Sequence, residues 1–455
     1  MLNTHVIMPR FLALLLLAIP LLLGACGRSD EEPEPVTTQL VLDPVQLLND
    51  STAILTWSRL NNPDFVQYRL LRQENPAETG VSVHWSPDRE ATSYRDSGLP
   101  YTDYVQYQVI GQLQSGQTIA SNIVVLRRPQ IKIVRALVFD VQYEADTREL
   151  FFFGKDGTIQ KYDVSSGQTT HTIRVGQPIG YCAFATYQGV RELYVPCDNG
   201  RVLIYDAATL GQRDEIYTLG SPNAPEWLTD VVASNGKLFV SFTYYSFGAP
   251  LRVYDRATKT RIGNLGSLAN SNMRLKKNPR PTAATATEFI GLGLSTFPTP
   301  QVAYRFSAVG TYVSQTNSPF AQRNYSLDGR LFEFSPAGDR YVSGAEGDIF
   351  STSDLRYLSS LPRDRSMPAS RTEFTCFGFD AATQTLHAGT KAKTFRVFSL
   401  PDYAPVRTLK TKRYPFKIFS DGAHGFITLS TESPVENYSP SSTAHPAKML
   451  VEHLD

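Results

Sequence analysis

Short runs in which apolar and polar residues alternate recur along most of the chain, from about residue 37 to the end. Alternation with a period of two is typical of half-buried β-strands, because successive side chains of a strand point to opposite faces. Residues that favour turns, namely Asn, Asp, Pro and Gly, separate the runs. The pattern therefore predicts an all-β protein.

The runs form a repeat in the part of the chain that begins at Ile131. Three of them end in the dipeptide Tyr-Asp and then turn through small polar residues, with the aspartates at Asp163, Asp206 and Asp255. The anchors of four weaker copies are Ser307, Asp354, Ser399 and Ser439. The mean spacing of about 46 residues is the length of a four-stranded propeller blade. A hairpin-like pair of runs lies upstream of each anchor, so each repeat has four strands.

Seven such repeats predict a seven-bladed β-propeller over residues 131–455. The segment resembles propellers of the WD-repeat-like type, although the Gly-His and Trp-Asp dipeptides of that family are absent. A propeller must close its ring, and two segments compete for the outer strand of the last blade. Residues 131–134 (IKIV) precede the first blade, whereas AKMLVEHL at the C-terminus is able to complete the seventh blade alone. We favour residues 131–134.

Residues 37–127 contain β-rich runs of a separate, smaller domain. Trp57 lies in the second run, Tyr68 in the third, and LPYTDYVQYQV contains Tyr104. These features resemble a fibronectin type III domain, and the resemblance implies a β-sandwich in which Tyr104 is the corner tyrosine. Domains of this kind are mostly spacers or interaction modules, and no catalytic constellation stands out in this one.

Residues 1–25 have the features of an export signal. Arg10 precedes the apolar run FLALLLLAIPLLL, which is too short to span a bilayer comfortably. The tetrapeptide LGAC, which begins at the last residue of this run, resembles the lipobox of bacterial lipoproteins, which implies that lipid is attached to Cys26 and that the mature chain starts there. Residues 26–36 are acidic and contain proline, which predicts a flexible tether.

The lipobox resemblance implies a location in the cell envelope, anchored through lipid to the outer membrane of a Gram-negative bacterium. Acidic residues soon after Cys26 also resemble the export signal of surface-displayed lipoproteins. A soluble spacer explains the same residues. Periplasmic and surface exposure therefore both stay open.

The 455 residues carry a formal net charge of only +1, which argues against a nucleic-acid partner. No CxxC motif and no Cys–His pair has the spacing of metal ligands, so neither a metal nor a cofactor is expected. If the second hairpin turns at QGVR, Cys182 faces Cys197, and a disulfide and two buried thiols are equally favoured. Cys376 is expected in a blade core.

Catalytic motifs are scarce. Gly-Leu-Gly at residues 291–293 lacks the rest of a dinucleotide fingerprint, and neither GxSxG nor a metalloprotease His-Glu pair occurs. Asp140 and Asp230 fall at equivalent positions of predicted innermost strands, with Asp380 near the end of such a strand. Carboxylates of this kind either bind a cation in the central channel or bond to the local backbone, and we favour the backbone.

Four successive connections between the predicted blades are rich in basic residues, and aromatic residues lie beside the first of them. We predict from these a basic, aromatic-flanked binding surface on one face of the propeller. The alternative is that the loops are basic for solubility and that the aromatic residues fill gaps between blades. The residues concerned are Arg274, Lys276, Lys277, Arg280, Arg323, Arg363, Arg365, Arg371, Lys412 and Arg413, with Trp227, Tyr244, Tyr245 and Phe247.

The sequence thus predicts a lipid-anchored binding or scaffold protein, whose partner is an anionic glycan or an acidic protein segment. The alternative is a propeller enzyme, a lyase or hydrolase that acts on exported carbohydrate. Such an enzyme requires acid, base or metal groups clustered at the channel mouth. Because the sequence offers only isolated candidates, it favours binding over catalysis.

Overall fold

The computed structural model describes residues 36, 39–77, 79–218, 227–243, 249–266, 272–283, 286–295, 299–318, 327–363, 373–422, 425–434 and 447–454. Within these ranges every regular element is a β-strand, as the alternating pattern predicts. None of the described residues forms a helix long and apolar enough to cross a membrane. The chain divides into two compact units, the first with residues 1–100 and 104–127 and the second with residues 101–103 and 128–455.

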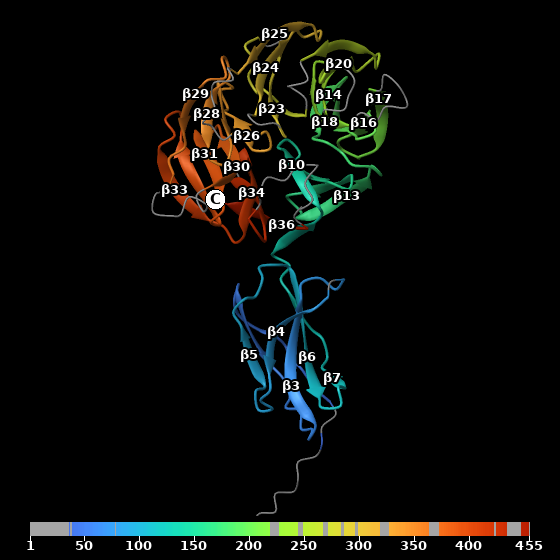
Figure 1. Ribbon diagram of the computed structural model, residues 1–455, viewed down its shortest axis with the longest axis vertical. Coiled ribbons are helices and arrows are strands. Elements are labelled where there is room, and N and C mark those ends of the chain that lie inside the picture. Colours follow the sequence, from blue (N-terminus) through green and yellow to red (C-terminus); the bar gives the residue numbers. More distant parts are fainter. Residues whose placement is uncertain are drawn as a thin grey trace, which may run out of the picture. The chain divides into compact units, whose positions relative to one another are not determined.

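The described residues of the second unit form seven antiparallel four-stranded sheets around a common centre (Figure 1). We call these sheets blades 1 to 7 in chain order. In blades 1 to 6, four consecutive strands lie side by side in the order in which they occur in the sequence. The first strand of each blade is the innermost, and the fourth is on the rim. The second unit is therefore a β-propeller.

Blade 1 contains β10 (Val138–Glu144), β11 (Glu149–Gly154), β12 (Thr158–Asp163) and β13 (Gln168–Arg174). Blade 2 contains β14 (Ala183–Tyr187), β15 (Val190–Pro196), β16 (Arg201–Asp206) and β17 (Gln212–Tyr217). Blade 3 contains β18 (Leu228–Ser234), β19 (Lys237–Phe242), β20 (Leu251–Asp255) and β21 (Arg261–Leu265). Blade 4 contains β22 (Met273–Lys277), β23 (Thr287–Gly293), β24 (Gln301–Phe306) and β25 (Tyr312–Asn317).

Blade 5 contains β26 (Phe332–Phe334), β27 (Arg340–Ser343), β28 (Asp348–Ser351) and β29 (Tyr357–Ser360). Blade 6 contains β30 (Phe374–Asp380), β31 (Thr385–Thr390), β32 (Thr394–Ser399) and β33 (Pro405–Lys410). Blade 7 contains β34 (Tyr414–Ser420), β35 (Phe426–Thr431), β36 (Lys448–Leu454) and β9 (Lys132–Arg135).

Blade 7 closes the ring with strands from both ends of the unit. Its third strand is the C-terminal β36, and its outer strand is β9, which precedes blade 1. In the antiparallel register Val134 lies opposite Met449, and both side chains are buried. The favoured closing segment, residues 131–134, thus overlaps the strand that closes the ring. The predicted anchor at Ser439 lies outside the described residues, and the third strand of the blade is β36 instead.

Apolar side chains from adjacent blades pack together between the sheets. In the space between blades 3 and 4, the Phe239 ring lies 5.2 Å from that of Phe289 and 4.5 Å from that of Phe306. All three side chains are almost fully buried, and burial of one phenylalanine contributes about 1.5–3 kcal/mol. Comparable clusters join the other blades, so the core of this unit is divided among the spaces between its blades.

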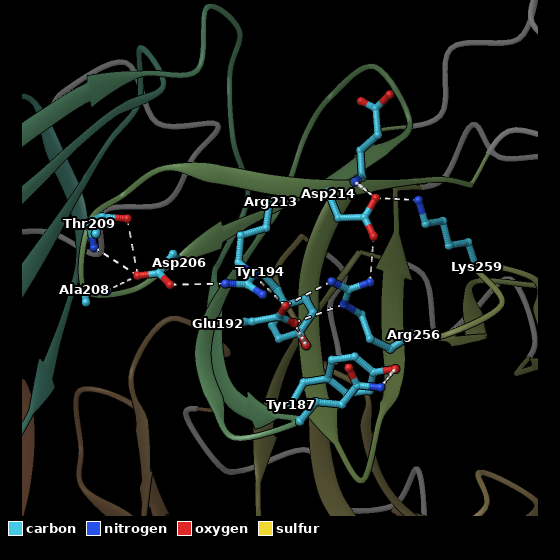
Figure 2. Close-up of polar contacts among 12 residues, drawn as sticks. Tyr187, Glu192, Tyr194, Asp206, Ala208, Thr209, Arg213, Asp214, Arg256 and Lys259 are labelled. Carbon is cyan, nitrogen blue, oxygen red and sulfur yellow. Dashed lines mark hydrogen bonds and ion pairs between the residues drawn. The ribbon is translucent and has the colours of Figure 1, made fainter.

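The aspartates of the Tyr-Asp repeats stabilise the turns that follow the third strand in blades 1 to 3. Asp206 accepts hydrogen bonds from the backbone N–H groups of Ala208 and Thr209 (Figure 2). Asp163 and Asp255 make equivalent bonds to the backbone two residues on. Asp side chains commonly stabilise turns in this way. The repeated aspartates are therefore parts of the blade scaffold.

A buried ion-pair cluster joins blades 2 and 3 (Figure 2). The guanidinium of Arg256, which follows β20, donates to both carboxylate oxygens of Glu192 at 3.0 Å each and to Asp214 at 2.8 Å. Glu192 lies in β15 and Asp214 in β17. The Tyr187 ring lies 5.0 Å from the same guanidinium. These contacts fix the geometry of one seam of the ring.

Cys182 and Cys197 are both buried free thiols, so the disulfide alternative was wrong. The hairpin of blade 2 turns at Gln188 and Gly189, which have φ angles of 48° and 80°. Two consecutive residues with positive φ make a type I′ turn, and this turn pairs Tyr187 with Val190. The predicted turn at QGVR lay one residue further along the chain. The register therefore differs by two residues from the one that placed the cysteines opposite each other.

We expect the native protein to react very slowly with a thiol reagent at the three cysteines of the propeller. Burial raises the pKa of Cys182, and it raises the pKa values of Cys197 and Cys376 to about 12, so each thiol stays protonated. A colorimetric thiol assay should detect all three groups only after denaturation. A change in electrophoretic mobility upon reduction of the monomer would contradict the expectation.

In the first unit, two antiparallel sheets enclose one hydrophobic core. Trp57 and Tyr68 lie in this core, with their ring centroids 5.7 Å apart. The hydroxyl of Tyr104 donates to the side chain of Gln106 on the same strand, so it does not make the backbone bond of a corner tyrosine. One sheet contains β1 (Gln46–Asn49), β2 (Thr52–Thr56) and β5 (Ser93–Asp96). The other contains β4 (Val81–Ser86), β3 (Phe65–Gln73), β6 (Tyr104–Leu113), β7 (Thr118–Ala120) and β8 (Val124–Arg127).

Candidate functional site

Charged side chains from four blades meet at the centre of the propeller. The Arg274 guanidinium, on β22 of blade 4, lies 2.8 Å from a carboxylate oxygen of Asp230 in blade 3. It also lies 3.3 Å from Asp140 in blade 1. The ammonium group of Lys417, on β34 of blade 7, is 3.1 Å from the other oxygen of Asp140. These groups, which we call the central cluster, connect blades on opposite sides of the ring.

The geometry around Arg274 leaves it little freedom. Its guanidinium carbon lies 3.7 Å from the centroid of the Tyr181 ring, a close cation–π contact. Asp230 also accepts hydrogen bonds from the backbone N–H groups of Val231 at 2.7 Å and Leu275 at 2.6 Å. Both the arginine and the aspartate are buried. The arginine is therefore fixed between two carboxylates and a ring face.

The pKa values of the two aspartates in the central cluster are shifted in opposite directions. Burial favours the protonated form of Asp140, but the charges of Lys417 and Arg274 outweigh it and lower the pKa. Burial dominates at Asp230 and raises its pKa to about 7, against the opposing effects of Arg274 and the two backbone donors. Asp140 thus stays ionised at neutral pH, whereas Asp230 titrates close to neutrality.

A second ion pair lies beside the central cluster. The ammonium group of Lys276 is 2.5 Å from the carboxylate of Glu333, which lies on β26 of blade 5. Burial lowers the pKa of Lys276, and the Glu333 carboxylate opposes that change. The pair extends the charged network to a fifth blade.

The space left at the centre is small. It measures about 40 Å³ and is bounded by residues that include Phe139, Lys276, Phe377 and Phe416. One ordered water molecule needs roughly 10–15 Å³ of such space. The cavity therefore holds a few water molecules, and a sugar ring does not fit. No group of three metal-ligating side chains occurs among the described residues.

Asp140 and Asp230 lie in innermost strands, as the repeat predicts. Neither a bound cation nor the local backbone alone accounts for this pair. The principal partners of the two aspartates are the side-chain cations Arg274 and Lys417. Asp380 fits the favoured interpretation, since it accepts backbone hydrogen bonds from Ala382 and Thr383 at the end of β30. The ring brings together carboxylates and cations that are far apart in the sequence.

Arg274 and Lys276 do not lie in an inter-blade connection, which corrects the sequence-based prediction. Both belong to β22, where Met273 and Leu275 are buried in the apolar core between blades. The run Met-Arg-Leu-Lys alternates with a period of two, and this was the signal for a strand. The side chains of Arg274 and Lys276 form ion pairs at the centre, so neither offers a free charge to a ligand.

The other predicted residues are scattered. Arg363 forms an ion pair with Glu346 at 2.7 Å, and Arg413 is buried and lies 3.2 Å from Glu432. Trp227 is 51% exposed. Outside the described residues lie Arg323, Arg365, Arg371, Tyr244, Tyr245 and Phe247.

Lys277 and Arg280 are exposed, as predicted for the binding surface. Lys277 is at the end of β22, where partial desolvation of its amino group and the charge of Arg191 lower its pKa. Arg280 lies beyond the strand, on the loop that follows. Within the described part of the chain, Arg280 makes no ion pair. It is therefore the predicted residue that best offers a free charge.

Arg280 lines a groove of about 430 Å³ between blades 4 and 5. The buried side chain of Asn278 fixes the loop, since it donates to the carbonyl oxygen of Gly338 at 3.1 Å and accepts from the N–H of Arg280 at 2.9 Å. Gly338 has a φ of 71°, and a Cβ there would lie 2.2 Å from Asn278. The other polar lining residues include Thr282, Glu288, Arg305, Ser314, Thr316, Asp339, Thr352 and Ser353.

No protein-family model and no curated protein matches the chain. Solved structures are similar to it. The β-propeller domain of Myceliophteria thermophila Cps50 (Swd1) is 10% identical, with a TM-score of 0.49, over 71% of this chain and 100% of that one. U3-55K is 11% identical, with a TM-score of 0.49, over 70% of this chain and 98% of that one. The RRP9 WD40 repeats are 12% identical, with a TM-score of 0.49, over 71% of this chain and 97% of that one. The assignment of this chain as a β-propeller rests on its own seven sheets.

Proposed function

We propose that the protein is an exported, lipid-anchored binding or scaffold module. Residues 1–25 direct export, Cys26 carries the lipid, and residues 26–36 form a tether. A fibronectin type III-like sandwich then acts as a spacer, and the propeller is the platform for a partner. The location that follows from the lipobox is the outer membrane of a Gram-negative bacterium, on its periplasmic or its outer side.

The filled centre of the propeller is the observation that favours binding over catalysis in this proposal. Ion pairs engage Asp140 and Asp230, and the cavity beside them measures about 40 Å³. General acid–base catalysis needs a carboxyl group within hydrogen-bond reach of a substrate. That arrangement supports recognition on the outer surfaces rather than a lyase or hydrolase reaction on carbohydrate in the channel.

The groove between blades 4 and 5 is the part of the predicted basic surface that best supports a ligand. Arg280 supplies five N–H donors in a planar fork, which suits a carboxylate or sulfate group. The carboxylate of Glu288 engages Arg305 at 2.8 Å, so Arg280 is the cation left for a partner. Ser and Thr hydroxyls on the walls offer further hydrogen bonds. We infer that the partner is anionic, either a glycan or an acidic protein segment.

Replacement of Arg280 by serine is expected to weaken binding of an anionic partner about tenfold, the effect of losing one charge-assisted contact of about 1.4 kcal/mol. Retention of the purified protein on immobilised heparin and on immobilised polyglutamate, over a series of salt concentrations, measures the change.

Arg261→Ser is the matched control, because Arg261 is exposed on the rim strand β21 and lies outside the groove. Its retention should equal that of the wild type. Failure of the wild type to bind either matrix, or equal retention of the Arg280 variant, would overturn the assignment of the groove.

A further inference from the structure

The outward face of the larger sheet in the first unit carries an unusual set of side chains. Along β6 every second residue is buried, and the residues between them point outward. Cross-strand partners share a face, so the neighbours of these residues on the other strands also lie on this outward side. The face contains Gln67, Arg69, Leu71, Gln73, Ser82, Trp85, Tyr104, Gln106, Gln108, Ile110, Gln112, Thr118, Ala120, Val125 and Arg127.

Trp85 is the most conspicuous member of this face. It lies on the edge strand β4 and is 65% exposed, although indole rings are usually mostly buried. Arg69 lies directly beside it on β3, and Ile110 follows on β6. An exposed indole next to a guanidinium is a typical anchor pair of binding surfaces, because tryptophan and arginine contribute most of the energy there.

Five glutamine side chains cover the middle of the face. The amide of Gln67 donates to that of Gln112 at 2.8 Å, and Gln106 is bonded to Gln73. Each amide group has two donor hydrogens and an acceptor oxygen, so a glutamine side chain can make more than one hydrogen bond at a time. The two pairs are six residues apart along β3, which corresponds to about 20 Å. The amides therefore form an extended strip.

The charge on this sheet has one sign. None of its five strands contains an aspartate or glutamate, whereas Arg69 and Arg127 are exposed on it. Within the described part of the chain Arg69 makes no ion pair. A surface with cations and no carboxylates favours an anionic partner.

We propose that this face binds a linear acidic polysaccharide. The indole of Trp85 stacks on the face of a sugar ring, the Arg69 guanidinium pairs with the carboxylate of the same or the next residue, and the glutamine amides bond to hydroxyl groups along the chain. A flat ring ligand fits an exposed indole on a flat sheet. An extended chain of hydroxylated rings matches a 20 Å strip of amides better than an acidic peptide, whose own backbone groups would seek a free strand edge.

The test uses the purified full chain and polygalacturonate of defined length as the acidic probe. Dextran serves as the neutral polysaccharide and polyglutamate as the acidic peptide. Affinity is measured by isothermal titration and by tryptophan fluorescence in a Trp227→Phe background. We expect polygalacturonate to bind and to quench Trp85, with dextran and polyglutamate each at least roughly tenfold weaker.

Trp85→Ala should weaken polygalacturonate binding roughly tenfold or more, and Arg69→Gln should remove the preference for the acidic chain over dextran. Trp227→Ala and Arg95→Gln are matched controls, since Trp227 is 51% exposed on the propeller and Arg95 is exposed on the other sheet of the first unit. Both controls should bind like the wild type.

The absence of polygalacturonate binding, unchanged binding by Trp85→Ala, or tighter binding of polyglutamate would each overturn the proposal. The outcome is independent of the propeller groove. An Arg280→Ser variant leaves this face intact, and a Trp85→Ala variant leaves the groove intact, so each failure is recognised separately.

Discussion

Replacing Arg274 with methionine is expected to lower the free energy of unfolding by about 3–5 kcal/mol, the usual cost of removing one partner of a buried ion pair. Methionine keeps most of the volume of the side chain but removes the guanidinium that lies between Asp140 and Asp230. Asp140 retains Lys417, whereas Asp230 is fully buried and loses its only side-chain cation among the described residues. Urea denaturation followed by far-ultraviolet circular dichroism measures the change.

Arg280→Met is the control for this variant, because Arg280 is exposed and makes no ion pair within the described residues. Its unfolding free energy should stay within about 0.5 kcal/mol of the wild type. Arg274→Met combined with Asp230→Asn removes both charges and should recover part of the loss. If Arg274→Met is as stable as Arg280→Met, the central cluster does not hold the blades together.

Val134→Asp is expected to destabilise the propeller by about 4 kcal/mol or more, since it introduces an unpaired charge into the seam that closes the ring. Val134 is 2% exposed and packs with Met449, Val451 and Val138 between blades 7 and 1. The side chains that pack against Val134 in this cluster are apolar and offer the carboxylate no hydrogen bond. The midpoint of thermal unfolding, with protease resistance at room temperature, measures the effect.

The same substitution at an exposed valine is the control. It distinguishes the loss of ring closure from a general destabilising effect of the new charge. Val125 on β8 is 40% exposed, so Val125→Asp should leave the unfolding midpoint close to that of the wild type. A Val134→Asp variant that unfolds like Val125→Asp would mean that β9 does not support the ring.

The blades follow from the sequence because each repeat contains its own short β-rich runs and turn residues. In β11 and β12, for example, the apolar runs, the Asp163 turn and the spacing to Asp206 are all local properties. The closing role of residues 131–134 follows from counting strands. These features depend on neighbours within one repeat, and they are therefore readable without the tertiary structure.

The centre of the ring was harder to predict for the opposite reason. Arg274 and Asp140 are 134 residues apart, and no local pattern pairs them. Because Arg274 and Lys276 are positively charged, their segment was predicted to be a surface loop, although it is a buried strand. Lys417 and Glu333 were missed because a single charged residue in an innermost strand gives no sign of its partner. The turn at Gln188 was misplaced by one residue, which was enough to shift the register of the hairpin by two.

The pairing of β9 with β36 also dictates the order in which the molecule is completed. A chain is synthesised from its N-terminus, so the edge of β9 stays unpaired until β36 has been synthesised. During that interval β34 and β35 form an unfinished sheet, and open strand edges invite association between chains. A molecular chaperone that shields this edge during synthesis or transport would therefore raise the yield of native protein more than one that acts on the individual blades.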